Sequence, residues 1–170
     1  MKNATRVLFA AFLVVGVAAC AKKQQVKPME EAAPPPPVST APAETNGRYT
    51  RESLDTDSCL RERVIYFDFD RSEIKPEFQA QVACHAEYLK QFPDARVRLE
   101  GNTDERGSRE YNLGLGERRG DAVQTALNAA GASSSQINVV SYGEERPTCR
   151  EHDESCWSKN RRVEIVYTAK

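Results

Sequence analysis

The stretch that decides the fold runs from residue 96 to residue 112 and reads RVRLEGNTDERGSREYN. Residues 96–100 alternate between charged and apolar side chains, which is the pattern of a half-buried β-strand. Ser108 can cap a helix, and Glu110 in the first turn would favour the helix dipole. Between them lies the polar turn 102–107, whose side chains are candidates for a binding site. The sequence therefore predicts a strand that leads through a polar turn into a helix.

The helix that Ser108 opens is predicted to continue to Gly131, because glycine is the preferred residue just after a helix C-terminus. Leu115, Val123 and Leu127 recur on one face of this segment. We expect that face to lie on the core.

The rest of the domain continues the alternation of strand and helix. A second helix is predicted to open at Pro76 and to end before Pro93. Runs of β-branched and aromatic residues predict further strands at 64–69, 137–140 and 163–167. The order β-α-β-α-β-β predicts an α+β fold, a two-layer sandwich in which two main helices cover one mixed sheet.

Composition excludes some classes of function. The chain has 170 residues, of which 39% are hydrophobic and 29% charged, enough for one core and too charged for a multi-span membrane protein. Lys and Arg number 24 against 25 for Asp and Glu, and the formal net charge of -1 gives no reason to expect a nucleic-acid partner.

Residues 1–19 have the pattern of a bacterial lipoprotein signal peptide. A basic start is followed at 7–17 by an apolar run that is too short to span a bilayer. The run ends in VAAC at 17–20. An ordinary signal peptide is the alternative, but small residues directly before Cys20 favour a lipobox, in which Cys20 is acylated and becomes the mature N-terminus. Cys20 is followed by Ala21 and not by Asp, which resembles lipoproteins that are sent on to the outer membrane.

Residues 20–54 are predicted to form a disordered, proline-rich tether behind the lipidated Cys20. Most of the nine prolines lie between Pro28 and Pro42, and the segment is too poor in apolar residues to offset its ordering entropy. The folded domain is expected at 55–170.

Motifs along this domain have the order and spacing of one family. They are YFDFD at 66–70, GNTDERG at 101–107, EYN at 110–112, LGERR at 115–119, VSYG at 140–143 and SKNRRVE at 158–164. Together they resemble the OmpA-like C-terminal domain family. Two positions depart from its pattern: Asn102 stands where this subfamily often has His, and Gly120 where Ala is usual. We expect Gly120 to weaken its helix by about 1 kcal/mol.

The resemblance implies non-covalent binding of the peptidoglycan stem peptide. With the lipobox and tether, it also implies an outer-membrane lipoprotein that anchors this membrane to the cell wall. Membership of the Tol-Pal system, a TolB-like periplasmic partner and a role in envelope integrity and cell division follow from the same resemblance. A wall-anchoring lipoprotein of this family outside the Tol-Pal system is the alternative.

The chemistry of the wall peptide selects the candidate site. Diaminopimelate carries an ammonium and a carboxylate on one carbon, so a site for it needs a carboxylate opposite a guanidinium. Asp104 is expected to take the ammonium, and the family assigns the carboxylate to the arginine that matches Arg119. Replacing either residue by alanine is expected to reduce wall binding sharply and to leave the fold intact. The pocket is expected to be completed by Phe69, Asp70, Asn112 and Leu115.

The other charged residues near these motifs are given structural roles. We expect Arg106 and Arg118 on solvated faces, and Arg161 and Arg162 in structural or interfacial positions. An enzyme is not expected, because the carboxylates of the motifs alternate with arginines that keep them ionised. His85, near the packed face of the helix that is predicted to open at Pro76, is expected to be a core or interface residue.

The cysteines of the domain are not part of the family pattern. A periplasmic metal module built from them and the histidines is an alternative, but no CxxC pair is present. In an oxidising periplasm disulfides are the better expectation. We predict the pairs Cys149–Cys156 and Cys59–Cys84, and neither a metal nor a cofactor.

Overall fold

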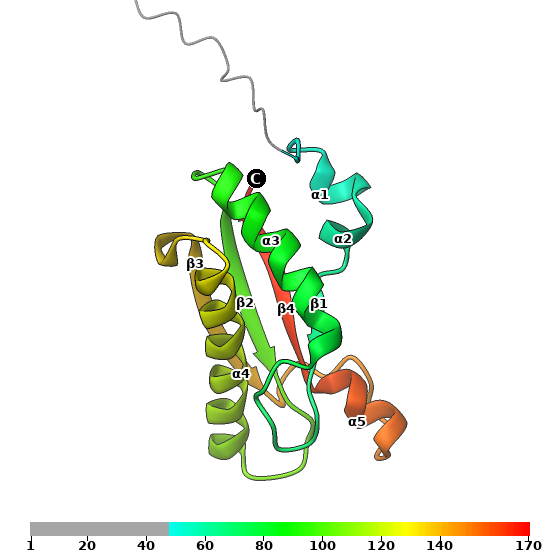
Figure 1. Ribbon diagram of the computed structural model, residues 1–170. Coiled ribbons are helices and arrows are strands. Elements are labelled where there is room, and N and C mark those ends of the chain that lie inside the picture. Colours follow the sequence, from blue (N-terminus) through cyan, green and yellow to red (C-terminus); the bar gives the residue numbers. More distant parts are fainter. Residues whose placement is uncertain (1–47) are drawn as a thin grey trace, which may run out of the picture. The chain divides into compact units, whose positions relative to one another are not determined.

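A mixed four-stranded sheet in the order β1-β4-β2-β3 carries two long helices on one face (Figure 1). The structure is a computed structural model that describes residues 48–170. The signal peptide, Cys20 and the tether up to residue 47 lie outside the described residues. The strands are β1 (Val64–Tyr66), β2 (Arg96–Asn102), β3 (Ile137–Gly143) and β4 (Arg162–Ala169). β2 pairs in parallel with β3 and antiparallel with β4, which in turn pairs antiparallel with β1.

The predicted helices are both present. A 3₁₀ turn at Pro76–Phe78 leads into α3 (Gln79–Gln91), and α4 spans Arg109–Ala129. Ser108 caps α4 as expected, because its side chain accepts a hydrogen bond from the Tyr111 amide. Three short helices were not predicted, namely α1 (Ser53–Thr56), α2 (Ser58–Arg61) and α5 (Glu154–Asn160).

The strand predicted at 64–69 ends earlier than expected. β1 closes at Tyr66, and one further bond, from the Phe67 amide to the Arg161 carbonyl at 2.9 Å, ties it to the chain before β4. Asp70 then has a φ of 56°, in the left-handed region that only a few non-glycine residues adopt. The chain therefore leaves the sheet and forms a loop at 67–75.

The folded part also begins before the predicted boundary at residue 55. Tyr49 is 1% exposed and Leu54 fully buried. The backbone of Tyr49 is held by the side chain of Gln91 in α3, which accepts from its amide at 3.0 Å and donates to its carbonyl. Tyr49 and Leu54 supply apolar surface to the core. The boundary was predicted too late because it was drawn from the average composition of residues 20–54, which is poor in apolar residues.

The buried face of α4 serves two purposes. Val123 and Leu127, in its second half, pack into the core between sheet and helices, as predicted. Asn112, Leu115 and Arg119 continue the same face toward the helix N-terminus and are also buried. One amphipathic helix therefore supplies both core and site residues.

Glycines allow α4 to lie directly on the sheet. A side chain at Gly101 of β2 would place its Cβ 2.0 Å from the carbonyl oxygen of Gly116, so the two backbones touch. A methyl at Gly120 would come within 2.4 Å of Cγ1 of Val139. Gly120 is therefore a packing position, which is more than the loss of helix propensity expected from the sequence.

Two disulfides join the cysteines that the sequence analysis paired. Cys59 of α2 is bridged to Cys84 of α3, and Cys149 is bridged to Cys156 of α5. Within residues 48–170, no helix is both long and apolar enough to cross a membrane.

Candidate functional site

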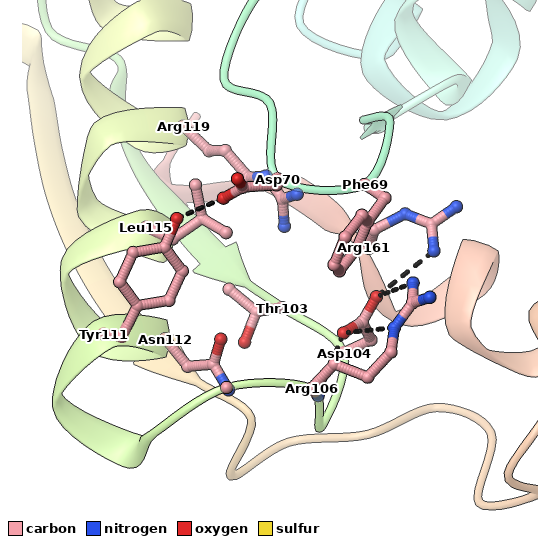
Figure 2. A pocket seen from close by; sticks show the side chains of 11 residues that line it. Phe69, Asp70, Thr103, Asp104, Arg106, Tyr111, Asn112, Leu115, Arg119 and Arg161 are labelled. Atoms are coloured by element: carbon pink, nitrogen blue, oxygen red, sulfur yellow. Dashed lines mark hydrogen bonds and ion pairs between the residues drawn. The ribbon is translucent and has the colours of Figure 1, made fainter.

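A pocket of about 190 Å³ opens where β2 ends, α4 begins and the loop 67–75 folds over both (Figure 2). All the residues predicted to bind the wall peptide line it. Their common wall also includes residues that were not predicted to bind: Thr103, Arg106, Gly107, Tyr111 and Arg161. The structure thus brings the predicted residues together, and their binding of a wall peptide stays a prediction.

Asp104 is a buried carboxylate held between two arginines. Its Oδ2 accepts from Nη2 of Arg106 at 2.7 Å and from Nη1 of Arg161 at 3.2 Å, and its Oδ1 accepts from the Arg106 amide at 3.1 Å. Burial opposes ionisation, but these hydrogen bonds outweigh it and keep the pKa of the Asp104 carboxyl below its usual value. Asp104 is therefore a fixed negative charge in the pocket wall.

Arg106 corrects the expectation of a solvated face. Its guanidinium carbon lies 4.0 Å from the centroid of the Phe69 ring and 4.2 Å from that of Trp157. This stacking between two rings, together with the ion pair to Asp104, holds the side chain at the pocket mouth. Figure 2 shows Arg106 beside Asp104. This position of Arg106 could not be predicted from the sequence, because Trp157 lies in the unpredicted helix α5.

Arg119 is fully buried, and its guanidinium clamps the backbone around the pocket. Nε donates to the Arg71 carbonyl at 2.8 Å, Nη1 to Asn102 at 2.9 Å and Nη2 to Asp68 at 3.0 Å. Burial lowers the pKa of Arg119 to about 10, which leaves it charged at neutral pH. Since a guanidinium has five N–H groups, two remain for a ligand. Arg119 therefore both builds the pocket and can bind within it.

Asp70 faces the pocket from the loop 67–75. The hydroxyl of Tyr111 donates to its carboxylate, which ties the loop to the first turn of α4 (Figure 2). Phe69 beside it is 54% exposed, so a large apolar ring stands at the pocket rim. Tyr111 was not predicted, although it adjoins Asn112 in the EYN motif.

Two buried oxygen atoms in the pocket have no hydrogen-bond partner among residues 48–170. They are Oγ1 of Thr103 and Oδ1 of Asn112, in side chains that are 3% and 1% exposed. The amide nitrogen of Asn112 donates to Glu144, which fixes the side chain with its oxygen free. Unpaired buried oxygens are costly, and both side chains line the pocket. They are therefore available to accept hydrogen bonds from a ligand.

Arg161, the residue that follows α5, forms the remaining wall. It is 6% exposed and donates to the Phe67 carbonyl at 3.0 Å and to Glu154. This residue lines the pocket as well as supporting it, whereas Arg162 bonds Glu164 and the carbonyl of Arg146, in keeping with the structural role expected for it. The Cys149–Cys156 bridge fastens the start of α5.

Asp104 and Glu105, in the turn beside the pocket, both have a lowered pKa. Hydrogen bonds from His152 and Trp157 lower the pKa of Glu105, as those from the arginines do for Asp104. General-acid catalysis of glycoside hydrolysis would need a carboxyl whose pKa is raised. Within residues 48–170, no group of three or more His, Cys, Asp or Glu side chains is arranged to hold a metal ion.

The charges of the pocket select a class of ligand. Arg106, Arg119 and Arg161 face Asp70 and Asp104, so both signs are present with an excess of positive charge. A small molecule that carries an ammonium and a carboxylate could be bound at both ends in such a site.

Comparison with known proteins agrees with the fold and the motifs. The sequence model of the OmpA family matches residues 66–161, which include β2, the pocket turn, α4 and α5. The chain belongs to the OmpA family. Within it, a peptidoglycan-associated lipoprotein of Pasteurella multocida is 39% identical over 167 residues, covering 98% of this chain and 100% of that protein. One from Legionella pneumophila is 49% identical over 123 residues, covering 72% of this chain and 69% of the relative.

Solved structures of the OmpA family share the architecture. The crystal structure of the peptidoglycan-associated lipoprotein from Burkholderia pseudomallei is 44% identical, with a TM-score of 0.67, and the match covers 68% of this chain and 98% of that chain. The C-terminal domain of Helicobacter pylori MotB is 21% identical with a TM-score of 0.58, which shows the shared fold alone.

Proposed function

We propose that this chain is an outer-membrane lipoprotein that binds peptidoglycan non-covalently and anchors the outer membrane to the cell wall. The observation that carries the proposal is the pocket with Asp104, Arg119 and the unpartnered oxygens of Thr103 and Asn112. Its relatives named peptidoglycan-associated lipoprotein support the same reading.

The ligand that fits the pocket chemistry is the diaminopimelate of the stem peptide. Its carboxylate is bound by the free N–H groups of Arg119, which lies at the pocket floor. Its ammonium is placed against Oδ1 of Asn112 and Oγ1 of Thr103, with the charge of Asp104 close by. Leu115 contacts the aliphatic part. Because both ends are recognised, an amino acid lacking either group binds less well.

Co-sedimentation with purified sacculi tests this binding. Asp104→Asn keeps the shape of the side chain and removes its charge, so we expect it to abolish sedimentation. The matched control is Asp121→Asn, an exposed aspartate on α4 that does not line the pocket. Free diaminopimelate should release the wild-type protein, whereas cadaverine, which has the two ammonium groups and neither carboxylate, should not. Unchanged sedimentation of a folded Asp104→Asn would overturn the assignment.

The proposal includes a lipid anchor at Cys20. Fractionation of cells that express Cys20→Ser should find the protein absent from the outer membrane, because one acyl chain already contributes about 0.8 kcal/mol per buried methylene. A Cys20→Ser protein that stays in outer-membrane fractions would count against acylation there.

The proposal also includes the Tol-Pal system, in support of envelope integrity and cell division, with a TolB-like periplasmic protein as partner. Cross-linking in intact cells should recover that partner with the wild-type chain. If sacculi are bound and no TolB-like protein is recovered, the chain is instead a wall-anchoring lipoprotein outside this system.

Binding is proposed to occur without turnover. Sacculi incubated with the purified protein should release no soluble fragments, and the appearance of muropeptides or free sugars would show an enzyme.

A further inference from the structure

The Cys59–Cys84 bridge closes a large loop of the chain. Its Cα atoms are 6.3 Å apart, and the two residues are separated by 25 positions in the sequence. Cys59 lies in α2 and Cys84 in the middle of α3. Both ends of segment 60–83 are therefore joined through one covalent link.

The closed segment contains one wall of the pocket. It holds β1, which has only three residues, lies at the edge of the sheet and pairs with β4 alone. It also holds the loop 67–75, which supplies Phe69 and Asp70 to the pocket. The loop has no strand or helix of its own and depends on contacts with its neighbours.

Those contacts come from the pocket arginines. Arg119 donates to the carbonyls of Asp68 and Arg71, and Arg161 donates to that of Phe67. Any displacement of the loop would break these bonds and leave the buried Arg119 with only the carbonyl of Asn102, in β2, as a hydrogen-bond acceptor. The geometry of the pocket therefore depends on the loop remaining in place.

The tether enters the domain far from the pocket. α1 lies at the same end of the sheet as the C-terminus, and the loop 67–75 lies at the other end (Figure 1). When the chain is held at the membrane and at the wall, tension enters at Tyr49. Without a cross-link it would pass in sequence through α1, α2 and β1 to the loop of the pocket.

We propose that the Cys59–Cys84 bridge is a tension bypass, which transfers a pull on the tether from α2 directly to α3. Segment 60–83 is then a covalently closed loop outside the load path, so β1 and the pocket loop carry no tension even after α1 has been pulled away. The inference rests on the proposed function, since it takes the ligand to be the wall and the pull to come from the membrane.

A pulling experiment on the full chain tests the bypass. A handle attached at Cys20 loads the chain from the tether side while the domain is bound to immobilised sacculi, and the lifetime of attachment is measured at constant force. We expect Cys59→Ser, Cys84→Ser to have wild-type binding at zero load and a severalfold shorter lifetime under load. The matched variant Cys149→Ser, Cys156→Ser removes the other bridge, which does not lie between the tether and the pocket loop. Relative to its own lifetime at zero load, it should lose no more under load than the wild type does.

A second pulling geometry separates the bypass from general stability. With the handle placed after Lys170, the load enters β4 at the same end of the domain and never crosses segment 60–83. The Cys59→Ser, Cys84→Ser chain should then hold as long as the wild type. Equal shortening in both geometries would make the bridge a general stabiliser and overturn the bypass.

The remaining outcomes are also decisive. Normal binding at zero load with equal lifetimes under a tether-side pull overturns the bypass alone. If the wild-type protein does not bind sacculi at zero load, both the proposed function and the bypass are overturned. If the double serine variant does not fold, the Cys149→Ser, Cys156→Ser chain can be loaded first and then treated with dithiothreitol, which cuts only Cys59–Cys84. Detachment that does not accelerate after this cut overturns the bypass.

Discussion

Arg106 stacks on Phe69, with its guanidinium carbon 4.0 Å from the centroid of a ring that is itself 54% exposed. An exposed phenylalanine in such a position is held by the arginine and not by a core. The pair forms the rim of the pocket, and the same guanidinium neutralises Asp104 below it.

Substitution of Arg106 tests whether this rim takes part in binding. Arg106→Ala removes a positive charge from the pocket and leaves Asp104 with Arg161 as its ion-pair partner. We expect affinity for sacculi to fall about tenfold, or roughly 1.4 kcal/mol, measured by co-sedimentation. Arg118→Ala, whose side chain lies on the exposed face of α4, should bind normally. Unchanged binding by Arg106→Ala would show that this side chain takes no part in binding. Tighter binding would show that Arg106 competes with the ligand for Asp104.

Arg119→Lys should affect the fold as well as binding. A lysine ammonium cannot reach the carbonyls of Asp68, Arg71 and Asn102 together, so buried acceptors lose their donors. We expect the free energy of unfolding to fall by about 2–4 kcal/mol and sedimentation with sacculi to be lost. Chemical denaturation measures the first effect, with Arg118→Lys as control. A variant that keeps wild-type stability and loses only binding would show a purely ligand-binding arginine, as the sequence alone predicts.

His85 should make stability depend on pH. It is fully buried, its Nε2 donates to the Glu62 carbonyl at 2.9 Å, and its Nδ1 therefore accepts from the Tyr167 hydroxyl as a neutral ring. Burial lowers the pKa of His85 from 6.5 to about 4. The unfolded chain thus binds more protons between these pH values, so this contribution is complete above about pH 6.5 and is lost as the pH falls toward 4.

The expected loss through His85 is about 3 kcal/mol, from a shift of roughly two and a half units. Denaturation at a series of pH values measures it. His85→Gln can still donate to the carbonyl of Glu62 and does not titrate, so its stability curve should be flatter over this range. The same slope in wild type and His85→Gln would contradict the assignment. His152→Gln, in an exposed position, is the control.

The Cys149–Cys156 bridge should stabilise α5 and, through it, the position of Arg161 in the pocket wall. Replacing both residues by serine opens a loop with a sequence separation of 7, which on the chain-entropy model costs about 2 kcal/mol. Because Arg161 follows α5 and Trp157 lies within it, affinity for sacculi should also fall. Thermal unfolding and co-sedimentation measure the two effects. Equal melting temperatures with and without the bridge would show that α5 is held by its polar contacts alone.

The sequence predicts the elements that have strong periodicity. The pattern of residues 96–112 gives β2, the polar turn and the start of α4 because each depends on local residues, and Ser108 caps the helix where expected. α5 has seven residues and no apolar period, and it is held by the cap of Asp153 and the disulfide. Such a helix depends on its tertiary contacts, which a local pattern does not contain.

The site was predicted from the chemistry of the wall peptide and from the motifs of the family resemblance, which supplied Phe69 and Asp70 as well as Arg119. Asp104, Asn112 and Arg119 lie on one turn and one helix, so their proximity follows from local geometry. The position of Arg106 depends on Trp157, which is far away in the sequence and reaches the pocket only through the fold. The same reason explains why the loop contacts of Arg119 were missed: they join α4 to residues 68 and 71.

The contact between Gly101 and Gly116 sets the width of the pocket. One glycine lies three residues before Asp104 and the other three residues before Arg119, so the backbone spacing at this contact fixes the span between the acidic and the basic group. That span is a property of main-chain atoms, and side chains at the rim can be exchanged without altering it. The pocket therefore accepts a ligand of one length. Substitutions at Phe69 or Tyr111 change the affinity for a ligand of that length, whereas binding of a longer or shorter ligand requires α4 to move on the sheet.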